Sequence, residues 1–275
     1  MTRATLAEVL RPALSGGYAV AGLVVLGWED AKAFVQAAEA EGAPVILQAG
    51  PGCRAYTPLP IMAAMFRHLA ERASVPVVTH LDHGESLAVC RQAVDLGFSS
   101  VMYDGSALPL AENIAATCAI VQMAHAAGVS VEAELGYVGY AQGAQSRGTD
   151  PGQVAEFARE TGVDALAIAI GNTHLMTTPG AQIDHGRLAA IRAAAPDLPL
   201  VLHGGSGISA SDRRALARGR ISKFNIGTEL RQTFGAALRE SLARDPARFD
   251  RIAILSETIP PLVTAARGII AGLRD

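Results

Sequence analysis

The sequence predicts a (β/α)8 barrel, because eight apolar stretches of strand length are each followed by a stretch with helical spacing. Strands that are apolar on both faces and alternate with helices are typical of a parallel sheet. Eight such units fit a closed barrel better than an open doubly wound sheet. The 275 residues suffice for one barrel, and no low-complexity linker interrupts them. We therefore expect residues 1–275 to form a single TIM-barrel domain.

The elements follow in chain order from the apolar spacing. A helix at residues 6–14 precedes the first strand, and one or two extra helices follow residue 246. The longest irregular stretch, residues 136–150, follows the fifth strand and would be a mobile loop on the catalytic face. The eight units, each strand with its helix, are 18–26 with 29–40, 44–49 with 58–72, 75–81 with 85–96, 99–103 with 109–127, 130–135 with 151–160, 165–170 with 186–194, 198–202 with 209–217, and 221–226 with 228–243.

Composition favours a small-molecule partner in the cytoplasm. The net charge is -3 and lysine occurs only at Lys32 and Lys223, so the clustered basic residues that bind a nucleic-acid backbone are lacking. The three cysteines are odd in number and widely separated, which fits reduced thiols rather than a disulfide framework. No apolar stretch reaches the roughly 20 residues of a membrane span, and no signal peptide is recognisable. We expect a cytoplasmic protein that binds neither membranes nor nucleic acid.

Three histidines predict a catalytic metal site. His83, His174 and His203 follow the third, sixth and seventh strands, whose carboxyl ends meet at one rim of a barrel. Three neutral imidazoles with an open fourth position describe a catalytic zinc site. The alternative is that one or two of these histidines are structural. His68 and His125 lie within helical stretches and are expected to have no such role.

Carboxylates surround this predicted centre. Glu134, in an otherwise buried strand, is a candidate second metal position or an orienting group, with Glu132 and His80 as further supports. Asp82 precedes a proposed ligand and could transfer a proton at a substrate oxygen, or instead orient His83. Asp104 is a candidate for contact with the metal or with a substrate hydroxyl, although Asp-Gly-Ser also makes a turn.

Two neighbouring loops predict a phosphate site. The loops after strands seven and eight, together with a helix N-terminus, are the recurrent phosphate site of these barrels because free amides and the helix dipole point at the anion. Thr228 could alternatively be only a helix cap. The candidate residues are Gly204, Gly205 and Ser206 in the first loop and Asn225, Gly227 and Thr228 in the second.

These motifs resemble those of the class II, zinc-dependent ketose-phosphate aldolases, especially the fructose-bisphosphate and tagatose-bisphosphate branch. The similarity runs from about residue 18 to residue 239 and is carried by residues 75–84, 97–106, 131–136, 148–151, 202–207 and 225–230. The resemblance implies a zinc-dependent lyase that reversibly cleaves a phosphorylated ketose to dihydroxyacetone phosphate, or a similar ketone, and an aldehyde. It further implies a monovalent cation, Na⁺ or K⁺, and a homodimer or homotetramer.

The resemblance also implies roles for individual residues. His83, His174 and His203 match the zinc ligands, and Asp82 matches the proton-transferring aspartate. Glu134 matches the secondary metal carboxylate. The residues that match the phosphate-binding positions are Gly204, Ser206, Asn225 and Thr228.

The chain departs from the family pattern at several positions. Leu175 stands where glycine normally approaches the phosphate and cation, and Gln142 stands where a loop glutamate acts as acid and base. Val24, Leu26 and Gly50 replace polar residues. Three alternatives therefore stay open: a homologue that binds metal and phosphosugar without lyase turnover, a metal-dependent sugar-phosphate epimerase, and a Schiff-base aldolase that uses Lys223.

Overall fold

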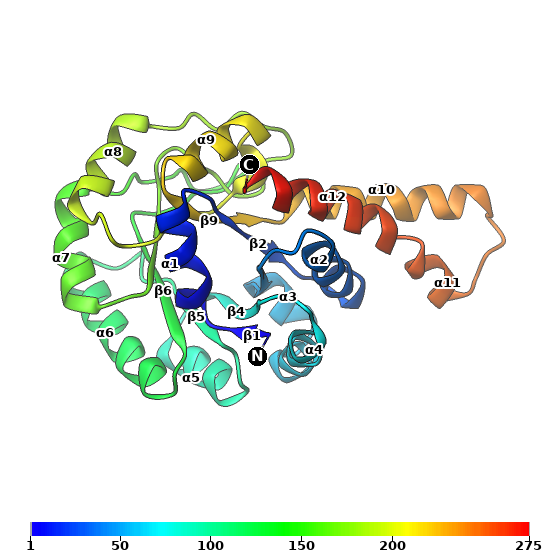
Figure 1. Cartoon of the computed structure of the whole chain (residues 1–275), viewed down its shortest axis with the longest axis horizontal. Helices are drawn as coiled ribbons and strands as arrows, with labels where there is room; N and C mark the ends of the chain where they lie inside the picture. Colours follow the sequence, from blue (N-terminus) through cyan, green and yellow to red (C-terminus); the bar gives the residue numbers. More distant parts are fainter. Residues whose placement is uncertain (1, 275) are drawn as a thin grey trace.

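A closed barrel of parallel strands forms the centre of the molecule (Figure 1). The computed structural model describes residues 2–274, and within them strands β2 to β9 pair in sequence order, with β9 returning to β2. This confirms the predicted (β/α)8 fold. The strands are β2 Val20–Val24, β3 Val45–Ala49, β4 Val77–Gly84, β5 Ser100–Tyr103, β6 Ser130–Leu135, β7 Ala165–Ile168, β8 Leu200–Leu202 and β9 Ile221–Ile226.

Helices surround the strands at close to the predicted positions. Local signals set their ends: Asp150 caps the first turn of α7 by accepting a hydrogen bond from the Gly152 amide, and Gly162 ends that helix in a left-handed conformation. The largest difference from the predicted bounds is at β4, which continues to Gly84 and so includes Asp82 and His83. The outer helices are α2 Trp28–Ala40, α4 Leu59–Arg72, α5 Leu87–Asp95, α6 Leu110–Ala126, α7 Pro151–Thr161, α8 His185–Ala194, α9 Ala210–Arg218 and α10 Thr228–Arg244.

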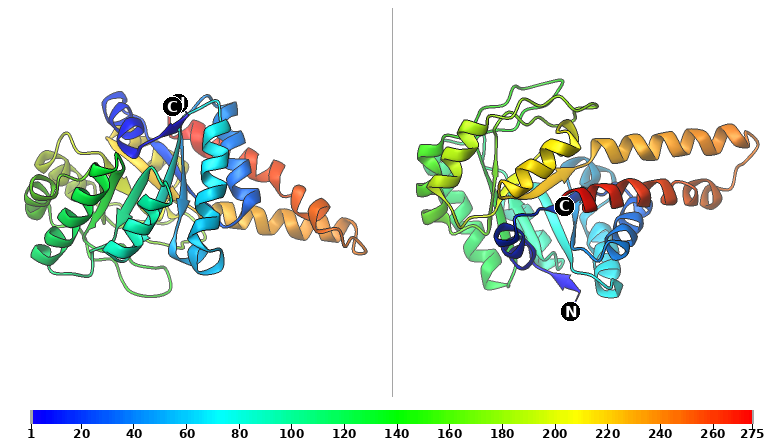
Figure 2. Two further views of the ribbon diagram at one scale, coloured as in Figure 1. Left: turned by 90° about the horizontal axis from the view of Figure 1, so that it is seen from below. Right: turned by 45° about the horizontal axis from the view of Figure 1, so that its top comes forward.

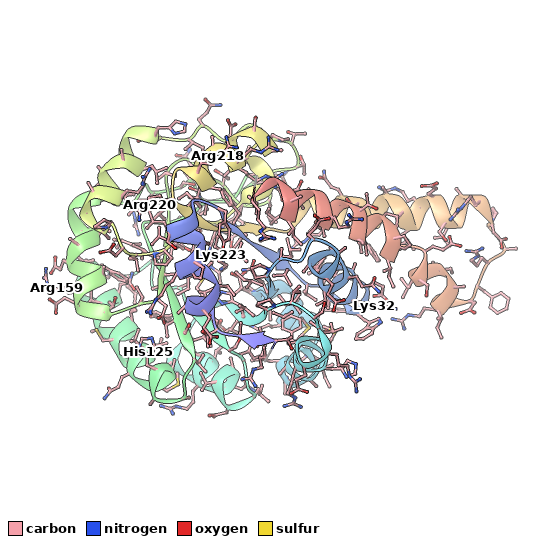
Figure 3. All side chains as sticks on the ribbon, viewed as in Figure 1. Lys32, His125, Arg159, Arg218, Arg220 and Lys223 are labelled. Carbon is pink, nitrogen blue, oxygen red and sulfur yellow. The ribbon has the colours of Figure 1, made fainter. Side chains whose placement is uncertain are left out.

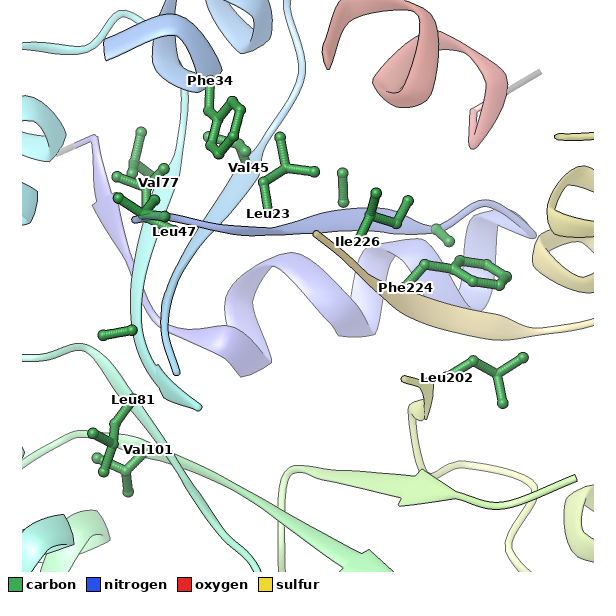
Figure 4. Packing of buried hydrophobic residues seen from close by; sticks show 14 of the residues in the cluster. Leu23, Phe34, Val45, Leu47, Val77, Leu81, Val101, Leu202, Phe224 and Ile226 are labelled. Carbon is green, nitrogen blue, oxygen red and sulfur yellow. The ribbon is translucent and has the colours of Figure 1, made fainter. Parts of the chain in front are cut away.

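The strands alternate between two apolar layers. On β3, Val45 and Leu47 pack outward beneath the helices, whereas Ile46 points into the barrel. Figure 4 shows part of the outer layer, in which Phe34 lies over Val45. Each such side chain that is fully buried contributes about 1.5–3 kcal/mol to folding.

Helix α1, Leu6–Gly16, closes the amino-terminal end of the barrel (Figure 1). A capping box between Thr5 and Glu8 starts it, and its apolar face packs into the barrel interior. The amide of Ala7 donates to Ser130 Oγ on β6. A two-residue strand, β1 Arg3–Ala4, pairs with β4 and is too short for periodicity to predict.

The carboxyl-terminal helices form an arm that projects from the barrel (Figures 1 and 2). It consists of α10, α11 Arg251–Ser256 and α12 Ile259–Gly272, and α12 returns to pack against α2. Both extra helices agree with the prediction, whereas a short helix α3, Pro51–Tyr56, was not predicted. Among the described residues, no helix combines the length and apolarity needed to cross a membrane.

Candidate active site

The three predicted histidines meet at the carboxyl-terminal rim of the barrel. The ring centroids of His83 and His203 are 4.7 Å apart, those of His83 and His174 are 5.3 Å apart, and those of His174 and His203 are 5.5 Å apart. One ring nitrogen from each lies within 4.8 Å of the other two, so the three nitrogens surround a common point. His68 on α4 and His125, which contacts Asp164, lie on other elements, away from this cluster.

Hydrogen bonds decide which ring nitrogen is free in two of the three imidazoles. His83 Nδ1 lies 2.8 Å from Asp104 Oδ2, which leaves Nε2 available. His203 Nε2 lies 3.1 Å from Glu132 Oε1. Within the described part of the chain, His203 Nδ1 and Glu134 Oε2 are buried without a hydrogen-bond partner, although they lie 3.5 Å apart. Unsatisfied buried atoms cost about 1–3 kcal/mol each, and a bound cation would satisfy both, so these residues fit a metal.

Burial and neighbouring charges shift the pKa values of these groups. Burial lowers the pKa of His174 to about 3, with repulsion from His203 and His83 acting in the same direction. The pKa of His203 is also far below its usual value, mainly through burial. Both imidazoles are therefore neutral, the state that binds metals.

His83 differs from the other two histidines because it is surrounded by carboxylates. Burial would lower its pKa, but Asp82, the hydrogen bond with Asp104, and Glu134 raise it to about 9. Burial raises the pKa of Glu134 to about 8. Without a metal the site thus holds protons on groups that could serve as ligands, and metal binding would displace them.

A fully buried layer of charge lies beneath the histidines. Lys223 Nζ lies 2.6 Å from Glu132 Oε2 and 3.4 Å from His80 Nε2, and all three side chains are 0% exposed. His80 Nδ1 contacts Ser100 Oγ at 2.9 Å. Figure 3 places Lys223 within the ring of strands and Arg159 at the periphery. Since the lysine amine is engaged in this buried pair, the arrangement does not favour a Schiff-base role.

Asp82 is held by amides rather than by a histidine. Its Oδ1 accepts hydrogen bonds from Gln48 Nε2 at 3.0 Å and from Asn225 Nδ2 at 3.1 Å. A Cβ atom at Gly50 would lie 3.3 Å from Asp82 Oδ2, so the glycine leaves this oxygen room. Asp104, not Asp82, orients His83, and Asp104 also accepts from the amide and hydroxyl of Ser106. Orienting His83, the alternative role predicted for Asp82, thus belongs to Asp104.

A cavity of about 260 Å³ joins the histidines to the predicted phosphate loops. Five of the six predicted phosphate residues line it, namely Gly204, Ser206, Asn225, Gly227 and Thr228, whereas Gly205 lies beneath them against Asn225 and Ile226. At Gly204 the backbone is left-handed, with φ 66°, and a Cβ atom would lie 2.2 Å from the Thr173 carbonyl oxygen, so only glycine fits.

No sequence pattern predicts a role for Arg54 or Arg231. Arg54 Nη1 donates to the carbonyl oxygens of Ala49 and Asp82, and Nη2 donates to the His83 carbonyl oxygen. These bonds hold His83 in a left-handed conformation, with φ 49°, which costs a non-glycine residue of order 1–3 kcal/mol. Arg231, on the first turns of α10, lines the cavity beside the predicted phosphate loops. Neither arginine belongs to a recognisable motif.

The loop of residues 136–150 reaches the three clustered histidines. His174 donates its amide to the Gly139 carbonyl oxygen at 2.8 Å, and the Ala141 amide donates to the His174 carbonyl oxygen at 2.9 Å. Between these bonds, the ring of Tyr140 stacks on the His174 imidazole at 5.0 Å. Gln142 is exposed and lines none of the described cavities.

Leu175 follows His174 and keeps the backbone conformation that glycine favours. Its φ is 60°, and its half-exposed side chain lines the phosphate cavity. Leu175 thus lies at the predicted phosphate loops and adopts the backbone conformation of the glycine that it replaces.

Comparison with known proteins gives consistent similarities across the chain. The family model "Fructose-bisphosphate aldolase class-II" matches residues 4–270. The chain is 40% identical over 258 residues to a fructose-bisphosphate aldolase of Geobacillus stearothermophilus, covering 91% of this chain and 89% of that one. It is 38% identical over 260 residues to a probable fructose-bisphosphate aldolase of Bacillus subtilis, covering 91% and 90%. The crystal structure of the YdjI aldolase from Escherichia coli K12 superimposes with a TM-score of 0.88 at 35% identity, covering 98% and 97%.

Proposed function

The chain belongs to the class II fructose-bisphosphate aldolase family, and we propose that it is a zinc-dependent aldolase that reversibly cleaves a phosphorylated ketose to dihydroxyacetone phosphate, or a similar ketone, and an aldehyde. Its membership and its relatives support aldolase activity. The observation that carries the zinc and phosphate parts of the proposal is the convergence of three imidazoles beside a glycine-lined cavity.

The glycine-lined cavity would bind the substrate phosphate. Gly204, Ser206, Thr228 at the start of α10, and Arg231 all line this one cavity. Backbone amides and a helix N-terminus stabilise an anion. Binding energy from this remote group would hold the reacting carbons in place beside the histidines.

His83, His174 and His203 would hold the metal, with Glu134 as the nearby carboxylate. A divalent metal bound there would act as a Lewis acid that polarises the substrate carbonyl. Asp104 and Glu132 keep His83 and His203 in the orientation that leaves one nitrogen of each free. The protein thus fixes the ligands through hydrogen bonds made outside the metal site.

Asp82 would remove the proton from the hydroxyl on the carbon that becomes the aldehyde. Its Oδ1 is engaged by Gln48 and Asn225, and its Oδ2 faces the open space at Gly50. As that oxygen loses its proton it becomes a carbonyl, the adjacent carbon–carbon bond breaks, and the electron pair moves to the ketone half.

Gln142 and Leu175 favour a second candidate, a homologue that binds metal and phosphosugar without turnover. One experiment distinguishes the aldolase from the binding protein without turnover. Zinc content is measured after purification, and cleavage of a panel of ketose mono- and bisphosphates is followed with and without a chelator. We expect chelation to abolish cleavage and zinc to restore it, with Na⁺ or K⁺ raising the rate. Cleavage unaffected by metal removal contradicts the proposal; ligand-induced thermal stabilisation without any turnover supports the second candidate.

We also propose that the enzyme is a cytoplasmic homo-oligomer. The three free cysteines fit a reducing compartment. The arm exposes 93% of Phe249 and 78% of Ile252 near its tip, while Trp28, Tyr56 and Phe234 line a cavity formed jointly by the barrel and the arm. A second copy of the chain offers both surfaces to the first. Light scattering should give a dimer or tetramer that Phe249→Asp weakens; a monomeric wild type would refute this.

A further inference from the structure

Cleavage of a ketose requires a proton donor that the predicted residues do not supply. Given the proposed function, breaking the carbon–carbon bond leaves a carbanion on the ketone half, and a proton must reach that carbon before the ketone is released. Gln142 occupies the position where the family resemblance places an acid, but a carboxamide cannot act as one. Its side chain is also exposed to solvent.

The cavity limits the candidates for this donor. Among the described residues that line it, the groups other than histidine and arginine that can readily exchange a proton are Asp82, Cys53 and Tyr140. Asp82 already takes the hydroxyl proton. The Cys53 thiol is buried and donates to the Gly50 carbonyl oxygen at 3.0 Å. Tyr140 is therefore the one group of the three without another function.

The structure holds Tyr140 in a suitable place. Backbone hydrogen bonds from the residues on either side fix it to the His174 segment. Its ring lies nearly parallel to the His174 imidazole, with an interplanar angle of 27°. Tyr140 lines both the phosphate cavity and an adjoining cavity bounded by Asp104 and Glu85. The residue is also 43% exposed, so water reaches its side chain.

We propose that the Tyr140 hydroxyl protonates the carbanion in cleavage and that its phenolate removes the same proton in condensation. In cleavage the O–H bond of Tyr140 breaks, a C–H bond forms on the ketone half, and the carbanion electron pair becomes that bond. Water then returns a proton to the phenolate, while Asp82 releases the hydroxyl proton to water. No net proton and no further reactant are consumed.

The variant Tyr140→Phe tests this assignment because it removes the hydroxyl and keeps the ring that stacks on His174. We expect ketose-phosphate cleavage to fall 10²–10³-fold, in the range of lost acid–base catalysis. Exchange of the dihydroxyacetone phosphate C–H proton in D₂O should fall equally. Hexacyanoferrate(III), which oxidises a carbanion directly, should restore ketose consumption to within about tenfold of wild type, because bond cleavage itself is intact.

Two matched variants control for the loop and for loss of a tyrosine hydroxyl. Gln142→Ala in the same loop, and Tyr18→Phe at a partly buried tyrosine near the amino-terminal end of the barrel, should keep exchange within about twofold of wild type. Zinc content and melting temperature of Tyr140→Phe should match wild type. Wild-type exchange in Tyr140→Phe, or a loss that the oxidant does not rescue, would overturn the assignment. A wild-type protein without cleavage or exchange would instead refute the proposed function, and this inference with it.

Discussion

The two ends of the barrel are built from the same strands but from opposite kinds of residue. At the amino-terminal end, Leu6 and Leu10 of α1 pack on Val20, Ile46 and Val78, and this interior is apolar. At the carboxyl-terminal end, the interior holds Lys223, Glu132 and three histidines, with the backbone of His83 in a left-handed conformation.

The molecule gains stability at one end of the barrel and loses it at the other. Apolar burial at the amino-terminal end stabilises the fold. Buried charges and unsatisfied polar atoms at the other end lower the free energy of unfolding. They persist because surrounding contacts hold these groups in place. Arg54 supplies part of that constraint by binding three carbonyl oxygens of the β3 and β4 ends. The barrel thus separates stability from chemistry along its axis.

The largest effect is expected from breaking the buried charge pair. Lys223→Met leaves the Glu132 carboxylate without its partner inside the barrel, which should lower the free energy of unfolding by about 3–5 kcal/mol. Urea denaturation of the apoprotein measures this. Adding Glu132→Gln should recover much of the loss, because the uncompensated charge is removed. Equal stability of wild type and Lys223→Met would show that the pair does not matter.

A substitution at the apolar end should affect stability without affecting the metal. Leu10→Ala removes a fully buried side chain from the α1 contact and should cost about 2–5 kcal/mol. Zinc affinity should match wild type, as measured by competition with a chromogenic chelator. Ser15→Ala on the exposed face of the same helix is the control and should stay within about 0.5 kcal/mol. A large change in zinc affinity for Leu10→Ala would contradict the separation of the two ends.

The smallest effect is expected at the polar end, where a substitution should alter metal binding more than stability. Asp104→Asn weakens the hydrogen bond that orients His83, so zinc affinity should fall about 10–100-fold, equivalent to about 1.4–2.7 kcal/mol. The free energy of unfolding of the apoprotein should change less than for Leu10→Ala. Asp197→Asn, at an exposed position, is the control. Unchanged zinc affinity in Asp104→Asn would exclude an orienting role.

Much of the fold and part of the site could be predicted from the sequence. Apolar periodicity reports local burial, so the strands and outer helices were placed close to their observed ends. Parallel strands in a closed barrel bring their carboxyl ends to one rim, which is why His83, His174 and His203 could be grouped although they are far apart in sequence. The two glycine-rich loops could be grouped for the same reason, because they follow the last two strands of the barrel.

Other features depend on atoms from different elements meeting. Strand pairing sets Ser100 opposite His80, and barrel closure brings Lys223 against Glu132. Arg54 and Tyr140 act through contacts with segments distant in sequence, and no local pattern encodes such contacts.

The sequence by itself determined the order of the elements and the chemical types at the strand ends, because both are local properties of the chain. Only the folded structure shows which ring nitrogen is free in His83 and His203, that Asp104 rather than Asp82 orients His83, and which loop side chain reaches the cavity. These outcomes follow from strand register and barrel closure, which fix interatomic distances to a fraction of an ångström and thereby select one hydrogen-bond pattern from several that the same residues could form.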